Sequence, residues 1–181
     1  MSTLIETDRI RFRAWKDRDK EPFAQMNSDP AVMTYLGPAL SREASDAAIE
    51  AQIALMENGE PALWAAATVH DNNLIGCIGV KRVTFDAHFT PSYEIGWRLA
   101  QAHWGKGYAT EGAKAALQFA FEKWDMPAIH SFTVHANIKA QAVMKRIGMT
   151  RIEGGDFDHP KLTKDDPLLG HVLYKIDRAT D

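Results

Sequence analysis

The 181-residue sequence contains a single cysteine, Cys77. One cysteine cannot form a disulfide within the chain and cannot build a cysteine zinc site, and this usage is typical of a reducing compartment. Cys77 lies in an apolar, strand-like run, so we expect a small buried side chain rather than a nucleophile. The histidines show no metal-binding spacing such as H-E-x-x-H, and we therefore predict no metal.

Long apolar runs and a strong excess of one charge are also absent. No segment approaches the roughly 20 consecutive apolar residues of a membrane span. The first eleven residues lack the apolar core of a signal peptide. The formal net charge is −3, which argues against a general nucleic-acid surface because such a surface needs a basic patch. We therefore expect a cytoplasmic protein that binds neither a membrane nor nucleic acid.

Length and composition are ordinary for one globular domain, with 45% hydrophobic and 25% charged residues. We predict that residues 1–181 form a single domain, since no repeat, low-complexity tract or linker interrupts them. Apolar periodicity and turn residues predict the secondary structure. Strands are expected at 4–14, 63–70, 74–81, 93–99, 128–135, 150–154 and 168–176, and helices at 17–27, 41–58, 107–124 and 137–147. This order predicts an α+β fold with a mixed sheet.

The stretch from Gln101 to Gly112 follows a predicted strand and opens the longest predicted helix. A helix N-terminus carries backbone N–H groups without partners and a partial positive charge. Gly105 and Gly107 remove the side chains that would keep a ligand away from those groups. The stretch therefore predicts a site for a phosphate or diphosphate.

Two common nucleotide-binding motifs do not fit this stretch. The Rossmann motif needs a third glycine where Thr110 stands. The P-loop needs a glycine five residues before Gly105, and none is there.

The same residues resemble the pyrophosphate-binding motif of GCN5-related N-acetyltransferases (GNAT), Gln/Arg-x-x-Gly-x-Gly/Ala. They are most similar to the RimJ/RimL-like group, whose members often read W-G-K-G-Y-A-T-E-A here. Gly105 and Gly107 take the two glycine positions. The first motif position is Ala102, with Gln101 one residue earlier. The family opening T-x-R-L-x-L-R is also similar to residues 7–13.

A second landmark covers residues 135–149, which are similar to the family pattern N-x-x-S-x-x-V-M-E-K-x-G-M/F. Matching positions are Asn137, Val143, Met144, Gly148 and Met149. The family serine is replaced by Ala140, which has no hydroxyl to donate to the leaving thiolate. The resemblance spans nearly the whole chain, from Thr7 to about Ile176.

The resemblance implies a central mixed, mostly antiparallel sheet of about six to seven strands flanked by about four helices. It also implies acetyl-CoA as the co-substrate. Carried over to this sequence, the cofactor-binding residues are Trp97, Arg98, Leu99, Trp104, Gly105, Lys106, Gly107, Tyr108, Ala109, Thr110 and Asn137. The backbone of residues 97–99 is where the family pairs with the pantetheine amides, and a bulge there would free an N–H for the thioester oxygen.

Acetyl transfer to an amine needs a base, because an ammonium group has no lone pair. Glu94 is the first candidate, since it lies on the strand that leads to the glycine motif. His159 is the second, beside Asp158 in a loop that borders the acceptor in related enzymes, and an imidazole titrates in a suitable range. The predicted function is therefore acetyl-CoA-dependent N-acetylation by direct attack on the thioester.

Two kinds of acceptor are compatible with the sequence, a protein N-terminal amine and a small-molecule amine. Acidic residues at 156, 158, 165 and 166 would suit a polycation or form a solvated loop. Ala102 and Ala140 leave a second possibility, an acyl-CoA-binding module of the same fold without turnover. An unrelated phosphate-binding domain is the third. Related enzymes are monomers or dimers, so we expect a monomer or homodimer.

Overall fold

The computed structural model of the chain describes residues 3–179. Its centre is a nine-stranded sheet in the order β1-β2-β3-β4-β5-β6-β9-β7, with β8 paired to β9. Among the described strand pairs, β5 and β6 are parallel and the others antiparallel. The strands are β1 (Thr3–Glu6), β2 (Ile10–Arg13), β3 (Leu63–Thr68), β4 (Leu74–Arg82), β5 (Tyr93–Leu99), β6 (Ala128–Val134), β7 (Thr150–Arg151), β8 (Phe157–Asp158) and β9 (Gly170–Asp177).

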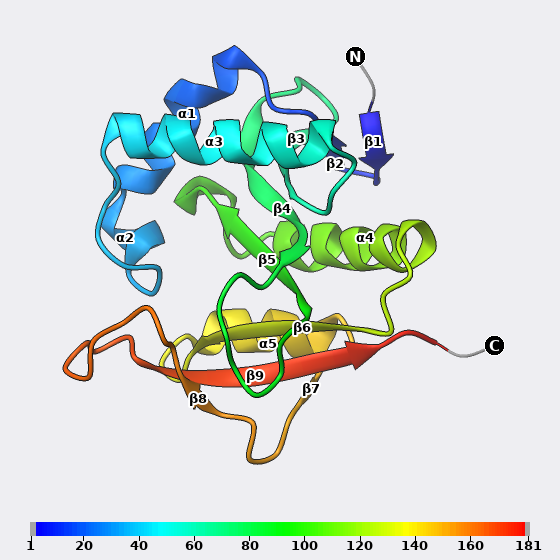
Figure 1. Cartoon of the computed structure of the whole chain (residues 1–181). Helices are drawn as coiled ribbons and strands as arrows, with labels where there is room; N and C mark the ends of the chain where they lie inside the picture. Colours follow the sequence, from blue (N-terminus) through cyan, green and yellow to red (C-terminus); the bar gives the residue numbers. More distant parts are fainter. Residues whose placement is uncertain (1–2, 180–181) are drawn as a thin grey trace.

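Helices cover both faces of this sheet. One face carries α1, α2 and α3, and the other carries α4 and α5 (Figure 1). The α-helices are α1 (Lys20–Ser28), α2 (Pro30–Met33), α3 (Arg42–Glu57), α4 (Tyr108–Lys123) and α5 (Ile138–Arg146), and the short 3-10 helices are η1 (Asp17–Asp19) and η2 (Gln101–His103). No helix within residues 3–179 combines the length and the apolar character that crossing a membrane requires.

The predicted mixed, mostly antiparallel sheet is confirmed, with more elements than the sequence indicated. The first predicted strand is two strands, because Thr7 Oγ1 accepts a hydrogen bond from the Ile10 amide at 3.0 Å and turns the chain between them. Asp29 ends α1 as expected, yet its carboxylate accepts from the Ala31 amide at 2.8 Å and starts α2. The two-residue strands β7 and β8 both pair with the edge of β9 that faces away from β6.

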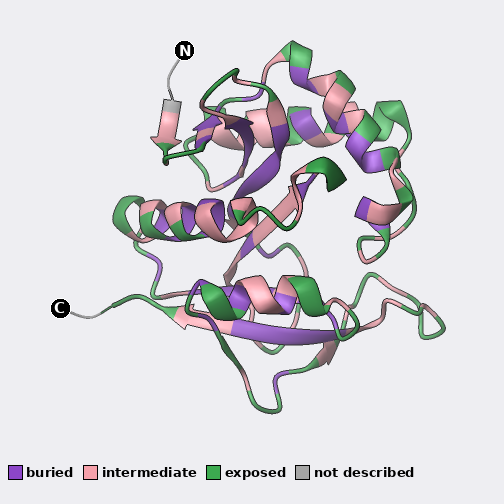
Figure 2. Ribbon diagram, turned by 180° about the vertical axis from the view of Figure 1, so that it is seen from behind, coloured by how far each residue is buried: buried purple, intermediate pink, exposed green. Residues whose placement is uncertain are grey.

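Two apolar clusters hold the layers together, one on each side of the sheet. The larger joins the sheet to α4 and α5, and the buried stripes of these helices face the sheet (Figure 2). Gly112 allows α4 to approach closely, since a Cβ at this position would lie 2.5 Å from Cδ1 of Ile78. The smaller cluster packs α1, α2 and α3 on the opposite face and includes Cys77. Cys77 is buried as predicted, and burial raises the pKa of its thiol.

Candidate functional site

The parallel strands β5 and β6 diverge almost as soon as they meet. Their register contains one residue pair, Glu94 with His130, and next to it the Ser131 hydroxyl donates to the Ile95 carbonyl at 3.0 Å. Figure 1 shows the two strands separating beyond this point. Within the described chain, the β6-facing backbone edge of β5 therefore has no strand partner from Gly96 onward. Such an edge offers N–H and C=O groups to an extended ligand.

The other edge of β5 is fully paired with β4. The register runs without a shift from Tyr93–Arg82 to Leu99–Gly76, so this ladder contains no bulge at residues 97–99. At the end of the strand, the Trp104 indole donates to the Leu99 carbonyl at 2.8 Å. This bond fixes the start of the loop that leads from β5 to α4.

That loop ends in two glycines with left-handed backbone conformations. Gly105 has φ of 71°, and Gly107, the N-cap of α4, has φ of 84°. No side chain of the described residues caps this helix end, so the first-turn amides of Tyr108, Ala109 and Thr110 face outward without an intrahelical acceptor. Lys106 is exposed and folds back, donating from Nζ to the Ala102 carbonyl at 2.8 Å.

A network that the sequence analysis did not identify links this loop to the turn between β1 and β2. The Arg9 guanidinium binds the Glu111 carboxylate, with Nε to Oε2 at 2.7 Å and Nη2 to Oε2 at 2.5 Å. Thr7 Oγ1 also donates to Glu111 Oε1 at 2.6 Å. Burial alone would raise the pKa of Glu111, but these bonds from Thr7 and Arg9 outweigh it and lower that pKa. The only sequence signal was that Arg9 and Glu111 each lie in a family-like motif.

The start of α5 lies beside the same loop. Asn137 caps α5, because its Oδ1 accepts from the Ala140 amide at 3.2 Å and its Nδ2 donates to Thr133 at 3.0 Å. Lys139, another residue that the sequence analysis did not single out, places Nζ 5.2 Å from the centroid of the Trp104 ring. The predicted cofactor-binding positions therefore follow one path, from the open edge of β5 through the glycine loop to α4, with Asn137 on the neighbouring helix.

Glu94 lies where β5 and β6 separate. Its side chain is 13% exposed, and Oε1 is 2.7 Å from Nζ of Lys81, its cross-strand partner on β4. Among the described residues, no hydrogen bond reaches Oε2 of Glu94. One carboxylate oxygen is thus held by a cation, while the other has no partner within the protein.

His159 belongs to a cluster of aromatic rings on the β6 and β9 face that lies opposite α5. The loop between β4 and β5 crosses this face in Figure 1. Its Phe85 and Phe89 rings contact Phe132 and His130 of β6. Close ring-centroid distances include 4.6 Å between Phe85 and His159, 5.0 Å between Phe89 and Phe157, and 5.2 Å between His159 and His171. We call these residues the aromatic cluster: Phe85, His88, Phe89, His130, Phe132, Phe157, His159 and His171.

Two histidines of the aromatic cluster differ in their hydrogen bonds. His130, the register partner of Glu94, is buried, and its Nδ1 has no hydrogen-bond partner among the described residues. His159 Nδ1 accepts from the Lys161 amide at 3.3 Å, which puts the proton of a neutral ring on Nε2. Burial, then the neighbouring His171, lowers the pKa of His159. The register partner of Glu94, His130, and the second candidate base, His159, both belong to the aromatic cluster.

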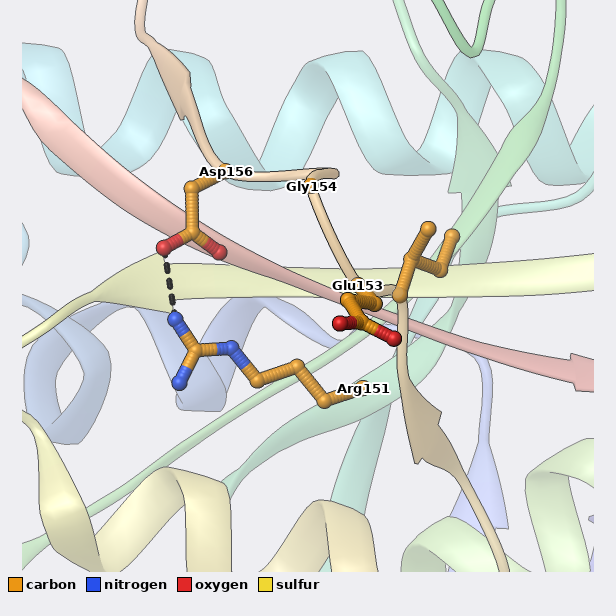
Figure 3. A pocket seen from close by; sticks show the side chains of 5 residues that line it. Arg151, Glu153, Gly154 and Asp156 are labelled. Atoms are coloured by element: carbon orange, nitrogen blue, oxygen red, sulfur yellow. Dashed lines mark hydrogen bonds and ion pairs between the residues drawn. The ribbon is translucent and has the colours of Figure 1, made fainter.

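Of the acidic residues expected near an acceptor, Asp156 forms an ion pair. Asp156 is 2.5 Å from Nη2 of Arg151, and both line a hollow of about 400 Å³ between β7 and β8 (Figure 3). His135 Nε2 also approaches Asp156 at 3.5 Å. Within residues 3–179 no three His, Cys, Asp or Glu side chains are grouped to hold a metal ion; that the protein needs no metal stays a prediction.

Comparison with known proteins adds a family match. The family model described as "Acetyltransferase (GNAT) domain" matches residues 9–150. The uncharacterised N-acetyltransferase YnaD of Bacillus subtilis (strain 168) is 28% identical over 149 residues, which cover 81% of this chain and 82% of YnaD.

Two solved structures are similar over almost their whole length. An acetyltransferase of the GNAT family from Bacillus anthracis superposes with a TM-score of 0.78 and 25% identity, covering 96% of this chain and 97% of that one. RimL, described as a ribosomal L7/L12 alpha-N-protein acetyltransferase in complex with coenzyme A, has a TM-score of 0.78 and 15% identity, covering 97% and 98%. The second likeness shows the fold alone.

The aromatic cluster predicts a pH-dependent stability. Burial lowers the pKa of His130, His159 and His171 from the ordinary value of 6.5. These histidines therefore bind protons at a higher pH in the unfolded chain than in the folded protein. The free energy of unfolding should decrease as the pH falls from about 7 through the folded pKa values. Urea denaturation across this range measures the decrease.

His159→Gln should make this decrease smaller, because one resisting group is gone. His70→Gln, which changes an exposed histidine outside the cluster, is the matched control and should keep the wild-type decrease. Equal pH dependence in wild type and His159→Gln would contradict the explanation.

Proposed function

Because the chain belongs to the GNAT family and is an N-acetyltransferase, we propose that it transfers the acetyl group of acetyl-CoA to a primary amine by direct attack on the thioester. The observation that carries this proposal is the continuity of two features. The open edge of β5 leads directly into the uncapped N-terminus of α4. One offers backbone hydrogen bonds to an extended chain, and the other offers amides to an anion.

Acetyl-CoA has the two parts that these features would bind. Its diphosphate would accept hydrogen bonds from the amides of residues 105–110, where the glycines leave the backbone accessible. Its pantetheine arm carries two amides and would pair with the open edge of β5 at residues 96–99. The family match supports this placement, and coenzyme A is bound in the RimL structure. Gripping the cofactor along its length would align the thioester for attack.

The reaction proceeds by addition and elimination. The neutral amine attacks the thioester carbonyl, forms the C–N bond and places negative charge on the carbonyl oxygen. Collapse of this intermediate breaks the C–S bond and releases CoA as a thiolate, which is then protonated. The amine loses one proton to a base, directly or through water. The products are an N-acetylated amine and CoA.

We assign the base to Glu94 in preference to His159. Glu94 lies where the strands separate, with Oε2 free of a partner among the described residues. In His159, Nδ1 already accepts a hydrogen bond and the neutral ring carries its proton on Nε2, so neither nitrogen offers a lone pair. His159 is better suited to donate a hydrogen bond from Nε2.

The leaving thiolate has no hydroxyl donor at the start of α5, where the family serine is Ala140. A thiol is acidic enough to leave without much help, which makes this substitution compatible with turnover. The alternative is a module that binds acyl-CoA without transferring it. That alternative predicts acetyl-CoA binding but no acetylated product from any amine.

We also propose that the acceptor enters over the aromatic cluster and carries an apolar group next to its amine. Four phenylalanines of this cluster are partly exposed. The lowered pKa values leave three of its histidines uncharged at neutral pH. Asp156 is already paired with Arg151. The partly exposed rings and the uncharged imidazoles suit an N-terminal peptide or an arylalkylamine better than a polycation.

Several features stay predictions that the fold leaves untested. They are the single domain over residues 1–181, the cytoplasmic location, the RimJ/RimL-like grouping, and the monomeric or homodimeric state.

Gly107→Glu should abolish acetyl-CoA binding, since it places a carboxylate against the diphosphate at a position with φ of 84°. Calorimetric titration with acetyl-CoA measures the loss. Gly59→Glu is the matched control, because Gly59 has a similar φ of 72° and lies at the opposite end of α4, where its carbonyl accepts from Trp124. If Gly107→Glu kept the wild-type affinity for acetyl-CoA, the glycine loop would not be the cofactor site.

Glu94→Gln should lower kcat/KM by roughly 10² to 10⁴, the usual range for loss of a general base. The effect should be least at high pH, where the amine is already deprotonated. Steady-state rates as a function of pH test this, with the exposed Glu153→Gln as the control. An unchanged profile would show that Glu94 is not the base.

A screen of amines tests the acceptor. Phenethylamine and peptides with an apolar N-terminal residue should be acetylated with kcat/KM at least about tenfold above that of spermidine, because aromatic contacts favour an apolar group next to the amine. Phe157→Ala should reduce the difference. A preference for spermidine would contradict the proposal that the acceptor binds over the aromatic cluster.

A further inference from the structure

Arg9 and Glu111 are 102 residues apart in the sequence and meet at the start of α4. Glu111 receives four donors from the β1–β2 turn: Thr7 Oγ1, the Arg9 amide at 3.1 Å, Arg9 Nε and Arg9 Nη2. Arg9 Nη1 donates in addition to the Lys106 carbonyl at 2.8 Å. One side chain therefore contacts both the glycine loop and the first turn of the helix.

The charge of Glu111 poses a problem for an anion site. A carboxylate in the first turn suits the positive end of the helix dipole. The same carboxylate would repel a diphosphate bound at the amides one turn away. The Arg9 guanidinium cancels this charge at 2.5 Å. Because the Arg9 side chain is 46% exposed and that of Glu111 21% exposed, the cation is the more accessible member of the pair.

Arg9 also lies directly against the glycine loop. A Cβ built on Gly107 would be 3.3 Å from Arg9 Nη2, and the guanidinium stacks over the Tyr108 ring at 4.7 Å from its centroid. A guanidinium has five N–H groups. Glu111 uses two and the Lys106 carbonyl uses one, which leaves two for a ligand. Binding the Lys106 carbonyl also keeps that oxygen occupied beside an anion.

We propose that the Arg9–Glu111 pair is part of the diphosphate site, in which Arg9 contributes its two remaining N–H groups to the bound diphosphate and Glu111 holds Arg9 in place. This inference rests on the proposed function, because it assigns residues to the same cofactor. The pair has two roles with different consequences. Arg9 binds the anion, whereas Glu111 is a positioning residue whose own charge opposes the anion once Arg9 is gone.

The test is a set of calorimetric titrations with acetyl-CoA. Arg9→Ala should weaken binding at least about tenfold, since it removes charge-assisted hydrogen bonds and leaves an uncompensated carboxylate. Glu111→Gln keeps the shape and the acceptor oxygen and should change affinity less. The double variant Arg9→Ala/Glu111→Gln should bind more tightly than Arg9→Ala alone, because the repelling charge is also gone.

Arg11→Ala is the matched control. Arg11 is close to Arg9 in the sequence and forms an ion pair with Glu6 at 2.7 Å. Arg11→Ala lowers the net charge by the same amount as Arg9→Ala without changing the glycine loop. Its affinity should equal that of wild type. Arg9→Lys, which keeps the charge but loses the bidentate geometry, should fall between wild type and Arg9→Ala, and it replaces Arg9→Ala if that variant does not fold.

The outcomes separate the two proposals. If wild type binds neither acetyl-CoA nor CoA, the proposed function fails. If wild type binds and Arg9→Ala binds equally well, the role of Arg9 alone is overturned. If the double variant is weaker than Arg9→Ala, the pair acts only through structure, and the charge argument is overturned. Recovery in the double variant supports it, since a general loss of stability would not be repaired by a second removed interaction.

Discussion

The early separation of β5 and β6 is the constraint on which the rest of the site depends. A parallel pair normally continues its hydrogen bonds along both strands, and here the ladder stops at Glu94 and His130. The sheet tolerates this because each strand has a complete antiparallel ladder on its other side, β4 for β5 and β9 for β6. The two complete antiparallel ladders thus hold the two diverging strands in place, and within residues 3–179 the β6-facing backbone of β5 stays unpaired beyond Ile95.

This arrangement also explains why the candidate groups gather where they do. The chain leaves the open edge of β5 through Trp104, turns at two glycines and enters α4, so the proposed cofactor path is continuous in sequence. The proposed acceptor side is built differently. It collects rings from the β4–β5 loop, from β6, and from the segment around Phe157, which only the tertiary fold brings together.

The sequence predicted the parts that local chemistry determines. The bounds of β5 follow from apolar residues between turns, and α3 begins after Ser41, whose hydroxyl accepts from the Ala44 amide. Gly105 and Gly107 were identified from the sequence because they lack side chains and match the motif, and both have the left-handed conformation that favours glycine. Side-chain pairs between different segments could not be predicted in this way. Neither the Arg9–Glu111 contact nor the Lys81–Glu94 ion pair leaves a periodic signal, since each joins segments whose distance is set by the fold. The extra helix α2 was missed because Asp29 both ends one helix and caps the next.

The uncapped N-terminus of α4 has a thermodynamic consequence. No described side chain satisfies its first amides, so an anion bound there would serve as the helix cap that the sequence does not provide. A ligand that occupies only the folded state adds to its stability, by about 1.4 kcal/mol for each tenfold increase in concentration above Kd. The long central helix packs against β4 and β5, which links its first turn to the sheet. The folded fraction of this protein would then rise and fall with the concentration of the cofactor.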